Sequence, residues 1–183
     1  MPRYIRAKAK GGTFFFTVVT HRRQKIFSLP ENRELLREAI INVRTELPFS
    51  LDAWVLLPDH LHCLWTLPEG DGDFSKRWAL IKLLFNKKAR QFLHMHSTDA
   101  GDSLSKQDQS AVWQKRFWEH QIRDEKDFQR HFDYIHYNPV KHGLVNQVRD
   151  WPFPTFHKYL QQGYYPENWG EGVSLEATAR FGE

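Results

Sequence analysis

Two strand-like runs separated by a two-residue turn restrict most strongly how this chain can fold. The first run extends from Phe49 to Leu57 and the second from His60 to Leu67, with Pro58-Asp59 between them. Proline and aspartate are typical turn residues, and so short a connection joins antiparallel neighbours. The sequence therefore predicts a β-hairpin and an antiparallel sheet built on it.

The other apolar segments predict further strands and helices before and after this hairpin. Aromatic and β-branched residues from Thr13 to Thr20 predict a buried strand. Apolar residues at helical spacing predict helices from Pro30 to about Pro48 and from Ser75 to about His94. A fourth strand is expected from Val112 to Trp118. This is the β-α-β-β-α-β order of a ferredoxin-like antiparallel sheet, so the predicted fold class is α+β.

One further helix is expected after the sheet, as a C-terminal addition that carries Tyr134. Acidic residues from Asp124 onward suit the positive end of a helix dipole. The helix is expected to end near Asn138, because the residue before a proline is disfavoured in the α region.

The chain of 183 residues is long enough for one domain and too short to suggest two. We expect a single domain over residues 1–183, with a mobile polar loop at 97–110 and a C-terminal extension at 144–183. Cys63 is the only cysteine, which excludes an intramolecular disulfide and a cysteine-based zinc site. The apolar run from Thr13 to Val19 is too short for a signal peptide or a membrane span, so a cytoplasmic protein is expected.

Basic residues gather in two blocks without any acid, although the net charge is only +4. Met1 to Pro30 contains seven Lys and Arg residues, and Lys76 to Arg90 contains six. One such block is usually a solvated surface, but two of them beside a candidate phosphate-handling site favour a nucleic-acid partner. The candidates for phosphate contacts are Lys82, Lys87, Lys88, Lys115 and Arg116.

His60 and His62 are two residues apart in the second strand of the hairpin. On a strand these side chains point to the same face, so both imidazoles can reach one ion. The competing interpretation is a pair of half-buried polar residues on the exposed side of the hairpin. A second pair, His94 and His96, falls at a helix end, where such spacing does not share a face, so it is interpreted as surface.

Tyr134 and Asn138 are four residues apart in the last predicted helix, which places them on one helix face. Tyr137 is the competing nucleophile, but it points about 100° away from Asn138. The ordinary alternatives are a core tyrosine for Tyr134 and a helix C-cap for Asn138.

Together these residues form a workable apparatus for a tyrosine that attacks a phosphodiester. A phenol with a pKa of about 10 is a weak nucleophile at neutral pH. A divalent ion held by His60, His62 and Asn138 could polarise the phosphate and stabilise its transition state. The hard phosphate suits Mg²⁺ or Mn²⁺, and the imidazoles shift the preference towards Mn²⁺.

Several motifs recur in the order found in a known family. The motifs are Pro58-Asp59-His60-Leu61-His62, Trp113-Gln114-Lys115-Arg116-Phe117-Trp118-Glu119-His120, Tyr134-Ile135-His136-Tyr137-Asn138-Pro139-Val140-Lys141, Asp150-Trp151-Pro152-Phe153-Pro154-Thr155-Phe156-His157 and Gly163-Tyr164. In these motifs the chain resembles the single-tyrosine transposases of the HUH endonuclease superfamily, and within them the REP-associated tyrosine transposases.

The resemblance implies a ferredoxin-like core and cleavage of single-stranded DNA near REP-like hairpins, with a transient 5′-phosphotyrosine and a free 3′-OH. It implies Tyr134 as nucleophile and His60, His62 and Asn138 as metal ligands. Better-known family members have glutamine at the third ligand position, and the shorter Asn138 fits the REP-associated branch. A monomer and a homodimer both remain open.

Two other functions compete with DNA strand transfer. One is a non-catalytic relative that binds structured DNA, and the presence of all four site residues disfavours it. The other is a metal-dependent nuclease in which water, rather than Tyr134, attacks the phosphate. A protein–DNA adduct that survives denaturation, and is lost when Tyr134 is replaced by Phe, would separate these three functions.

Overall fold

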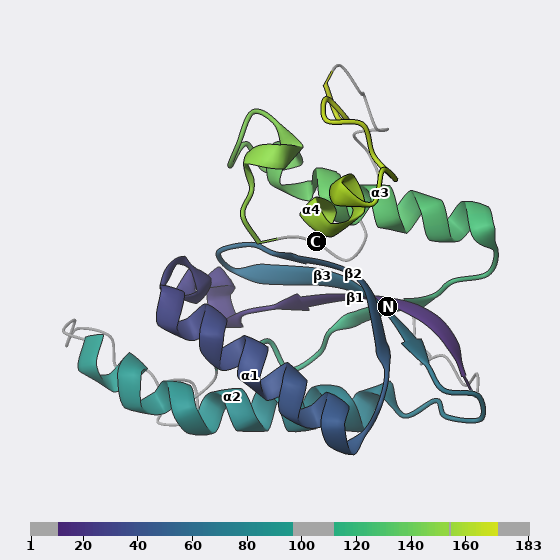
Figure 1. Cartoon of the computed structure of the whole chain (residues 1–183). Coiled ribbons are helices and arrows are strands. Elements are labelled where there is room, and N and C mark those ends of the chain that lie inside the picture. The colour runs from purple at the N-terminus through teal and green to yellow at the C-terminus, as the bar shows by residue number, and fades with distance from the viewer. Residues whose placement is uncertain (1–10, 97–111, 154, 172–183) are drawn as a thin grey trace, which may run out of the picture.

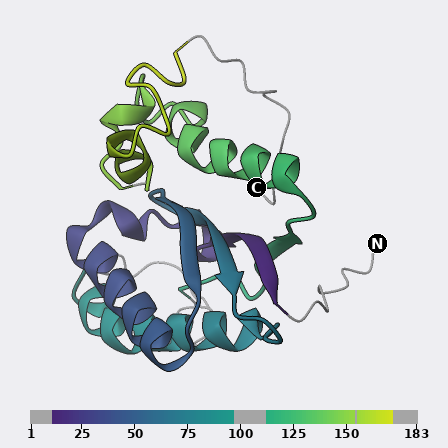
Figure 2. The same cartoon turned by 45° about the vertical axis from the view of Figure 1, so that its right-hand side comes forward.

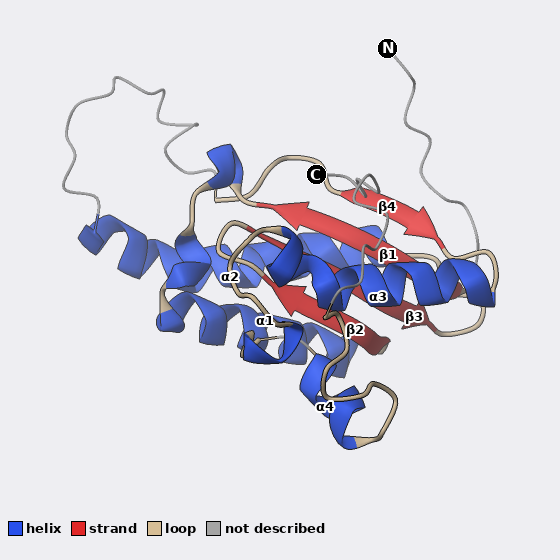
Figure 3. Ribbon diagram, turned by 90° about the horizontal axis from the view of Figure 1, so that it is seen from above, coloured by secondary structure: helices blue, strands red, loops and turns tan. Residues whose placement is uncertain are grey.

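The computed structural model describes residues 11–96, 112–153 and 155–171, with side chains of 90–96 left out. Its four strands form one antiparallel sheet in the order β2-β3-β1-β4 (Figure 3). The strands are β1 (Gly12–Val19), β2 (Ser50–Leu56), β3 (His60–Leu67) and β4 (Trp118–Gln121). This order confirms the predicted ferredoxin-like α+β fold.

Helices cover both faces of the sheet (Figures 1 and 2). Helices α1 (Pro30–Glu46) and α2 (Phe74–His96) pack against one face, and α3 (Glu125–Lys141) lies across the other with α4 (Phe156–Gln161) beside it. Three short 3₁₀ turns, η1 (His21–Arg23), η2 (Ile26–Ser28) and η3 (Val148–Asp150), complete the order. No helix among the described residues is long and apolar enough to cross a membrane.

Alternation along the strands divides the core into two layers. On β1, Phe14 and Phe16 belong to the cluster under α1 and α2, whereas Phe15 belongs to the cluster under α3. In the first cluster, Trp65 stacks on Trp78 with ring centroids 4.3 Å apart. Such aromatic pairs add about 0.5–1.5 kcal/mol each beyond the burial of their surface. Both faces of the sheet are therefore covered by apolar side chains, and buried polar side chains on either face need partners.

The predicted hairpin is confirmed. Leu56 pairs with Leu61, and the amide of Leu57 donates to the carbonyl of His60 at 2.8 Å across the Pro58-Asp59 turn. β3 is an inner strand, with β1 on its other side, where Val19 pairs with His60.

The predicted fourth strand is wrong in position. Residues 112–117 contribute only an isolated bridge between Thr20 and Trp113, and β4 begins at Trp118. The buried Trp113 ring packs 5.5 Å from Phe27 and 5.3 Å from Phe85, so this aromatic stretch fills the first core layer beside α2. Packing, and not ladder pairing, accounts for its strand-like composition.

The predicted end of the tyrosine helix is also wrong, because α3 continues past Pro139 to Lys141. Gly143 has φ of +65° and its amide donates to the carbonyl of Val140, while the amide of Leu144 donates to the carbonyl of Pro139. This is a Schellman closure, which satisfies the last carbonyls of a helix. The helix therefore contains the proline in its final turn, ends at Lys141 and is closed by the glycine.

The described part of the C-terminal extension covers the open edge of the sheet at β2. The Trp151 indole donates to the carbonyl of Leu56 at 3.1 Å, and the amide of Thr155 donates to the carbonyl of Trp54 at 2.9 Å. Pairing of this kind protects an edge strand from other chains. The loop expected at 97–110 lies outside the described residues.

Candidate active site

The two histidines of β3 lie under α3 and are almost inaccessible to solvent. His60 is 1% exposed and His62 is 0% exposed, so the alternative of a half-buried surface pair is wrong. Their ring centroids are 4.9 Å apart and the rings are close to perpendicular, at 85°. The hairpin thus brings both imidazoles to one point on the buried face of the sheet.

Each imidazole is oriented by a hydrogen bond to its Nδ1 atom. His60 Nδ1 lies 2.6 Å from Asp59 Oδ1, and His62 Nδ1 lies 2.8 Å from Thr17 Oγ1. Nε2 is therefore the atom of each ring that is placed to bind an ion. Metal-binding histidines are commonly oriented in this way by a carboxylate or another oxygen.

Asp59 is itself held in its ionised form. Burial alone would raise the pKa of this carboxyl, but hydrogen bonds from His60 and from Arg23, at 3.2 Å, bring the pKa below its ordinary value. The carboxylate of Asp59 accepts the hydrogen bond that orients the His60 ring.

Tyr134 faces these histidines from α3. Its ring lies edge-on to His62, with centroids 5.3 Å apart, and the side chain is only 7% exposed. Asn138 follows one turn later and is fully buried; the C-cap of the helix is His142, so Asn138 is not a capping residue. Tyr137 instead contacts Trp169, at 6.4 Å. The helix register therefore agrees with the assignment of Tyr134, and not Tyr137, to the histidine side.

Two residues of this site were missed by the sequence prediction. Lys141 Nζ donates to Tyr134 Oη at 2.9 Å, and the same ammonium group lies 4.7 Å from the centre of the Tyr134 ring. The His142 ring lies 5.1 Å from the His60 ring. The spacing of seven residues from Tyr134 to Lys141 is two helical turns and would have revealed this contact, but the helix was expected to end at Asn138.

A second group of possible metal ligands lies at the start of α3. The ligand atoms of His120, Asp127 and His131 lie within 4.8 Å of one another. Asp127 Oδ2 accepts from His120 Nε2 at 2.8 Å and from the Arg123 amide at 3.1 Å. Burial would raise the pKa of Asp127, but these hydrogen bonds lower it to about 2. For His131, in contrast, burial itself lowers the pKa, because it disfavours the charged imidazolium.

Phe15 of β1 connects the two groups. Its ring lies 5.6 Å from His62, 4.8 Å from His131 and 6.1 Å from Tyr134. A rigid aromatic side chain at this point fixes the distance between the start of α3 and the histidine pair.

The opposite side of α3 is held by the C-terminal extension. His136 Nε2 lies 2.8 Å from Thr155 Oγ1, and its Nδ1 lies 3.2 Å from Tyr165 Oη, which donates to Asp133 at 2.7 Å. Burial lowers the pKa of His136 to about 3, so the ring is neutral. These bonds position the helix that carries Tyr134.

Of the five predicted phosphate-contacting residues, three lie on the far side of the sheet from these rings. Lys82, Lys87 and Lys88 are on α2, across the sheet from α3 (Figure 1). Lys82 donates to the carbonyl of Gln114 at 3.1 Å, and Lys88 forms an ion pair with Glu38. Exposed Lys115 and Arg116 precede β4. Their contact with DNA stays a prediction.

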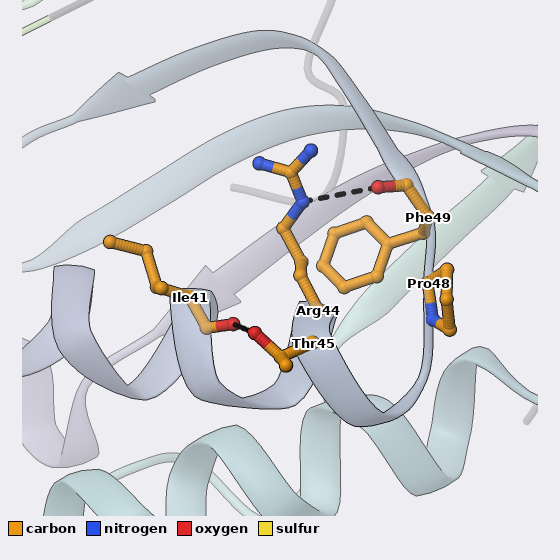
Figure 4. Close-up of a pocket in the computed structure, with 5 residues that line it drawn as sticks. All are labelled: Ile41, Arg44, Thr45, Pro48 and Phe49. Carbon is orange, nitrogen blue, oxygen red and sulfur yellow. Dashed lines mark hydrogen bonds between the residues drawn. The ribbon is translucent and has the colours of Figure 1, made fainter.

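A hollow of about 320 Å³ lies at the end of α1 (Figure 4). In it, Arg44 donates to the carbonyl of Phe49 at 3.1 Å and Thr45 to that of Ile41 at 3.1 Å. These polar groups thus have partners within the hollow, which lies on the α1 side of the sheet and not beside Tyr134.

A ferredoxin-like sheet with two histidines on an inner strand, opposite a tyrosine on an added helix, defines the class of HUH transposase folds. No family model matches the chain. A REP-associated tyrosine transposase of Escherichia coli is 47% identical over 175 residues, which cover 95% of this chain and 94% of that protein. A protein of Haemophilus influenzae named for the same family is 41% identical over 180 residues, with 96% and 97% covered.

A solved structure agrees with these relatives. It is a REP-associated tyrosine transposase bound to a REP hairpin, with a TM-score of 0.78 and 45% identity over 100% of this chain and 98% of that one. The chain belongs to the REP-associated tyrosine transposases, and it is a transposase enzyme.

Proposed function

We propose that this transposase cuts and rejoins single-stranded DNA at REP-like hairpins, with Tyr134 as the nucleophile. The observation that carries the proposal is the buried contact between the Tyr134 ring and His62 at 5.3 Å. The hairpin partner is supported by the relative whose structure contains a REP hairpin.

In the cutting step, Tyr134 Oη attacks the scissile phosphorus. The Oη–P bond forms as the bond from phosphorus to the 3′ oxygen breaks, which leaves a 5′-phosphotyrosine and a free 3′-OH. The covalent intermediate retains the phosphodiester energy, so the reverse attack by a 3′-OH rejoins a strand without another energy source.

The residues fit a divalent ion, Mg²⁺ or Mn²⁺, held by His60, His62 and Asn138. The set offers two imidazole nitrogens whose rings are fixed by Asp59 and Thr17, together with an amide oxygen. When bound, such an ion would polarise the phosphate and stabilise its transition state. The group of His120, Asp127 and His131 is the rival site, but the Arg123 guanidinium lies 3.3 Å from Asp127 and opposes a second cation there.

The test is incubation of the protein with a labelled hairpin oligonucleotide that carries the repeat sequence flanking its gene, with Mg²⁺ or Mn²⁺ and with chelator. We expect a protein–DNA adduct that survives denaturation, is lost in Tyr134→Phe and is retained in Tyr137→Phe. A wild-type protein that binds without cutting would indicate a DNA-binding protein. Cleavage that persists in Tyr134→Phe would indicate attack by water.

The same assay locates the metal. His60→Ala and His62→Ala should abolish cleavage and lower Mn²⁺ binding measured by calorimetry without DNA, while hairpin binding is retained. His120→Ala and His131→Ala serve as matched controls on the rival group. If Mn²⁺ binding were lost only in His120→Ala and His131→Ala, the assignment of the metal to His60 and His62 would be wrong.

A further inference from the structure

We propose that Lys141 is a catalytic residue that acts on the phenol oxygen of Tyr134 in both cutting and rejoining. The inference rests on the proposed role of Tyr134 as nucleophile. It concerns a side chain that the sequence motifs did not single out for catalysis, and which the structure places directly on the reacting atom.

The contact is defined by two measurements. Lys141 Nζ lies 2.9 Å from Tyr134 Oη, within hydrogen-bond distance, and 4.7 Å from the ring centroid. The ammonium group therefore approaches both the oxygen and the face of the same ring. The hydrogen bond and the cation–π contact together restrict the rotation of the phenol ring. The hydrogen bond also stabilises negative charge on the phenol oxygen.

The backbone holds Lys141 in place for this contact. Lys141 is the last residue of α3, two turns after Tyr134, and the closure at Gly143 fixes that turn. A cation also suits the negative end of the helix dipole. Because α3 continues past Pro139, Lys141 lies on the same helix face as Tyr134.

Low solvent exposure makes the ammonium charge effective. Tyr134 is 7% exposed, and it is contacted by His62 from β3, Phe15 from β1 and Lys141 from α3. A charge at hydrogen-bond distance interacts more strongly in such a site than in bulk water. Lys141 donates a hydrogen bond to the phenol oxygen within this site.

The role in the reaction follows from where charge changes. As Tyr134 Oη forms its bond to phosphorus, the phenol proton passes to water, and the departing 3′ oxygen takes a proton from water. In rejoining, the Oη–P bond breaks and the phenol oxygen receives the electron pair. Lys141 stabilises the partial negative charge on Oη in a transition state that both directions share.

An alternative role for Lys141 is a contact with a DNA phosphate, and it predicts different results. A phosphate contact would weaken hairpin binding and reduce the slope of log K against log salt by about 0.7. A charge that acts on Tyr134 would leave the affinity and the salt slope unchanged and would change only the rates of the covalent steps.

The experiment measures single-turnover adduct formation on the labelled hairpin, and the resealing of the isolated adduct by a strand with a 3′-OH. In Lys141→Met, both rates should fall by a similar factor, about 10²–10³ for the loss of one such donor. The fraction of adduct at equilibrium should therefore change little. Lys141→Arg should restore part of both rates, because it retains a cationic donor.

Lys158→Met is the matched control, because Lys158 also lies over a tyrosine ring, 5.3 Å from the centroid of Tyr159, on α4. It should leave both rates unchanged. Wild-type rates in Lys141→Met, or a loss confined to binding and salt slope, would overturn the inference while the loss of adduct in Tyr134→Phe still supports the proposed function. A wild-type protein without any adduct would refute both.

Discussion

His136 shows how one buried side chain makes the stability of this protein depend on pH. The ring is fully buried between α3 and the C-terminal extension, with Thr155 and Tyr165 as partners. Burial lowers its pKa from 6.5 to about 3. Between these values the unfolded chain binds a proton at this position and the folded chain does not.

The unfolding free energy should therefore be largest above pH 6.5 and should fall as the pH is lowered towards 3. His136 contributes at most about 1.4 kcal/mol per pH unit to the slope of the unfolding free energy against pH. In His136→Gln the slope should be smaller, although the variant is less stable at neutral pH. Urea unfolding at several pH values measures both slopes, and equal slopes would contradict a neutral His136.

The sequence predicted the placement of those candidate residues whose spacing matches the period of their element, and their roles stay a prediction. His60 and His62 follow the period of a strand, and Tyr134 and Asn138 follow that of a helix. Thr17, which orients His62, is distant in sequence, and its role depends on strand register, so no local pattern reveals it.

At the scale of elements, α3 determines the site because it carries Tyr134, Asn138 and Lys141. Its start is fixed by Asp124, whose side chain accepts from the amide of Asp127. Its end is fixed by Gly143, whose φ of +65° is costly for any residue with a Cβ.

Replacement of Gly143 by Ala should destabilise the protein by about 1 kcal/mol. No atom lies within 4 Å of the position a Cβ would occupy, so the cost is conformational and not steric. Gly143→Asn is the matched control, and it should cost less because asparagine tolerates this conformation. Chemical denaturation measures the difference, and an alanine variant as stable as the wild type would show that the turn relaxes.

Two elements differ from their predicted bounds, one because of long-range packing and the other because of a local helix closure. Trp113 has the composition of a strand residue, but Phe27 and Phe85 receive its ring in the core. Pro139 normally ends a helix, but the closure at Gly143 satisfies the carbonyls that follow it. In the first case tertiary packing overrules local propensity, and in the second a glycine four residues after the proline sets the helix end.

At the scale of the molecule, the sheet separates the layer of α1 and α2 from the layer of α3. The order of the elements was predictable, because the hairpin and the alternation of strands and helices leave few antiparallel arrangements. The position of each basic residue relative to the active site was not predictable, since it depends on which face each helix covers. Helix α2 covers the face opposite α3 (Figure 1).

This separation leads to a prediction about DNA binding. Lys87 and Lys88 lie across the sheet from Tyr134, whereas exposed Lys115 and Arg116 precede β4, which pairs with β1. A DNA strand that reaches Tyr134 needs phosphate contacts on the α3 side of the sheet or at the edge of the sheet. We therefore expect Lys115 and Arg116 to contribute more to binding than the two lysines of α2.

The measurement is hairpin affinity across a salt series for two double variants, Lys115→Ala with Arg116→Ala, and Lys87→Ala with Lys88→Ala. Each lost phosphate contact on a single strand should reduce the slope of log K against log salt by about 0.7. The first variant should flatten the slope and weaken binding to every hairpin alike, because phosphate contacts position DNA without reading its sequence. If only Lys87→Ala with Lys88→Ala flattened the slope of log K against log salt, the DNA backbone would lie along the α2 face of the sheet. The DNA strand would then have to pass around the edge of the sheet to reach Tyr134.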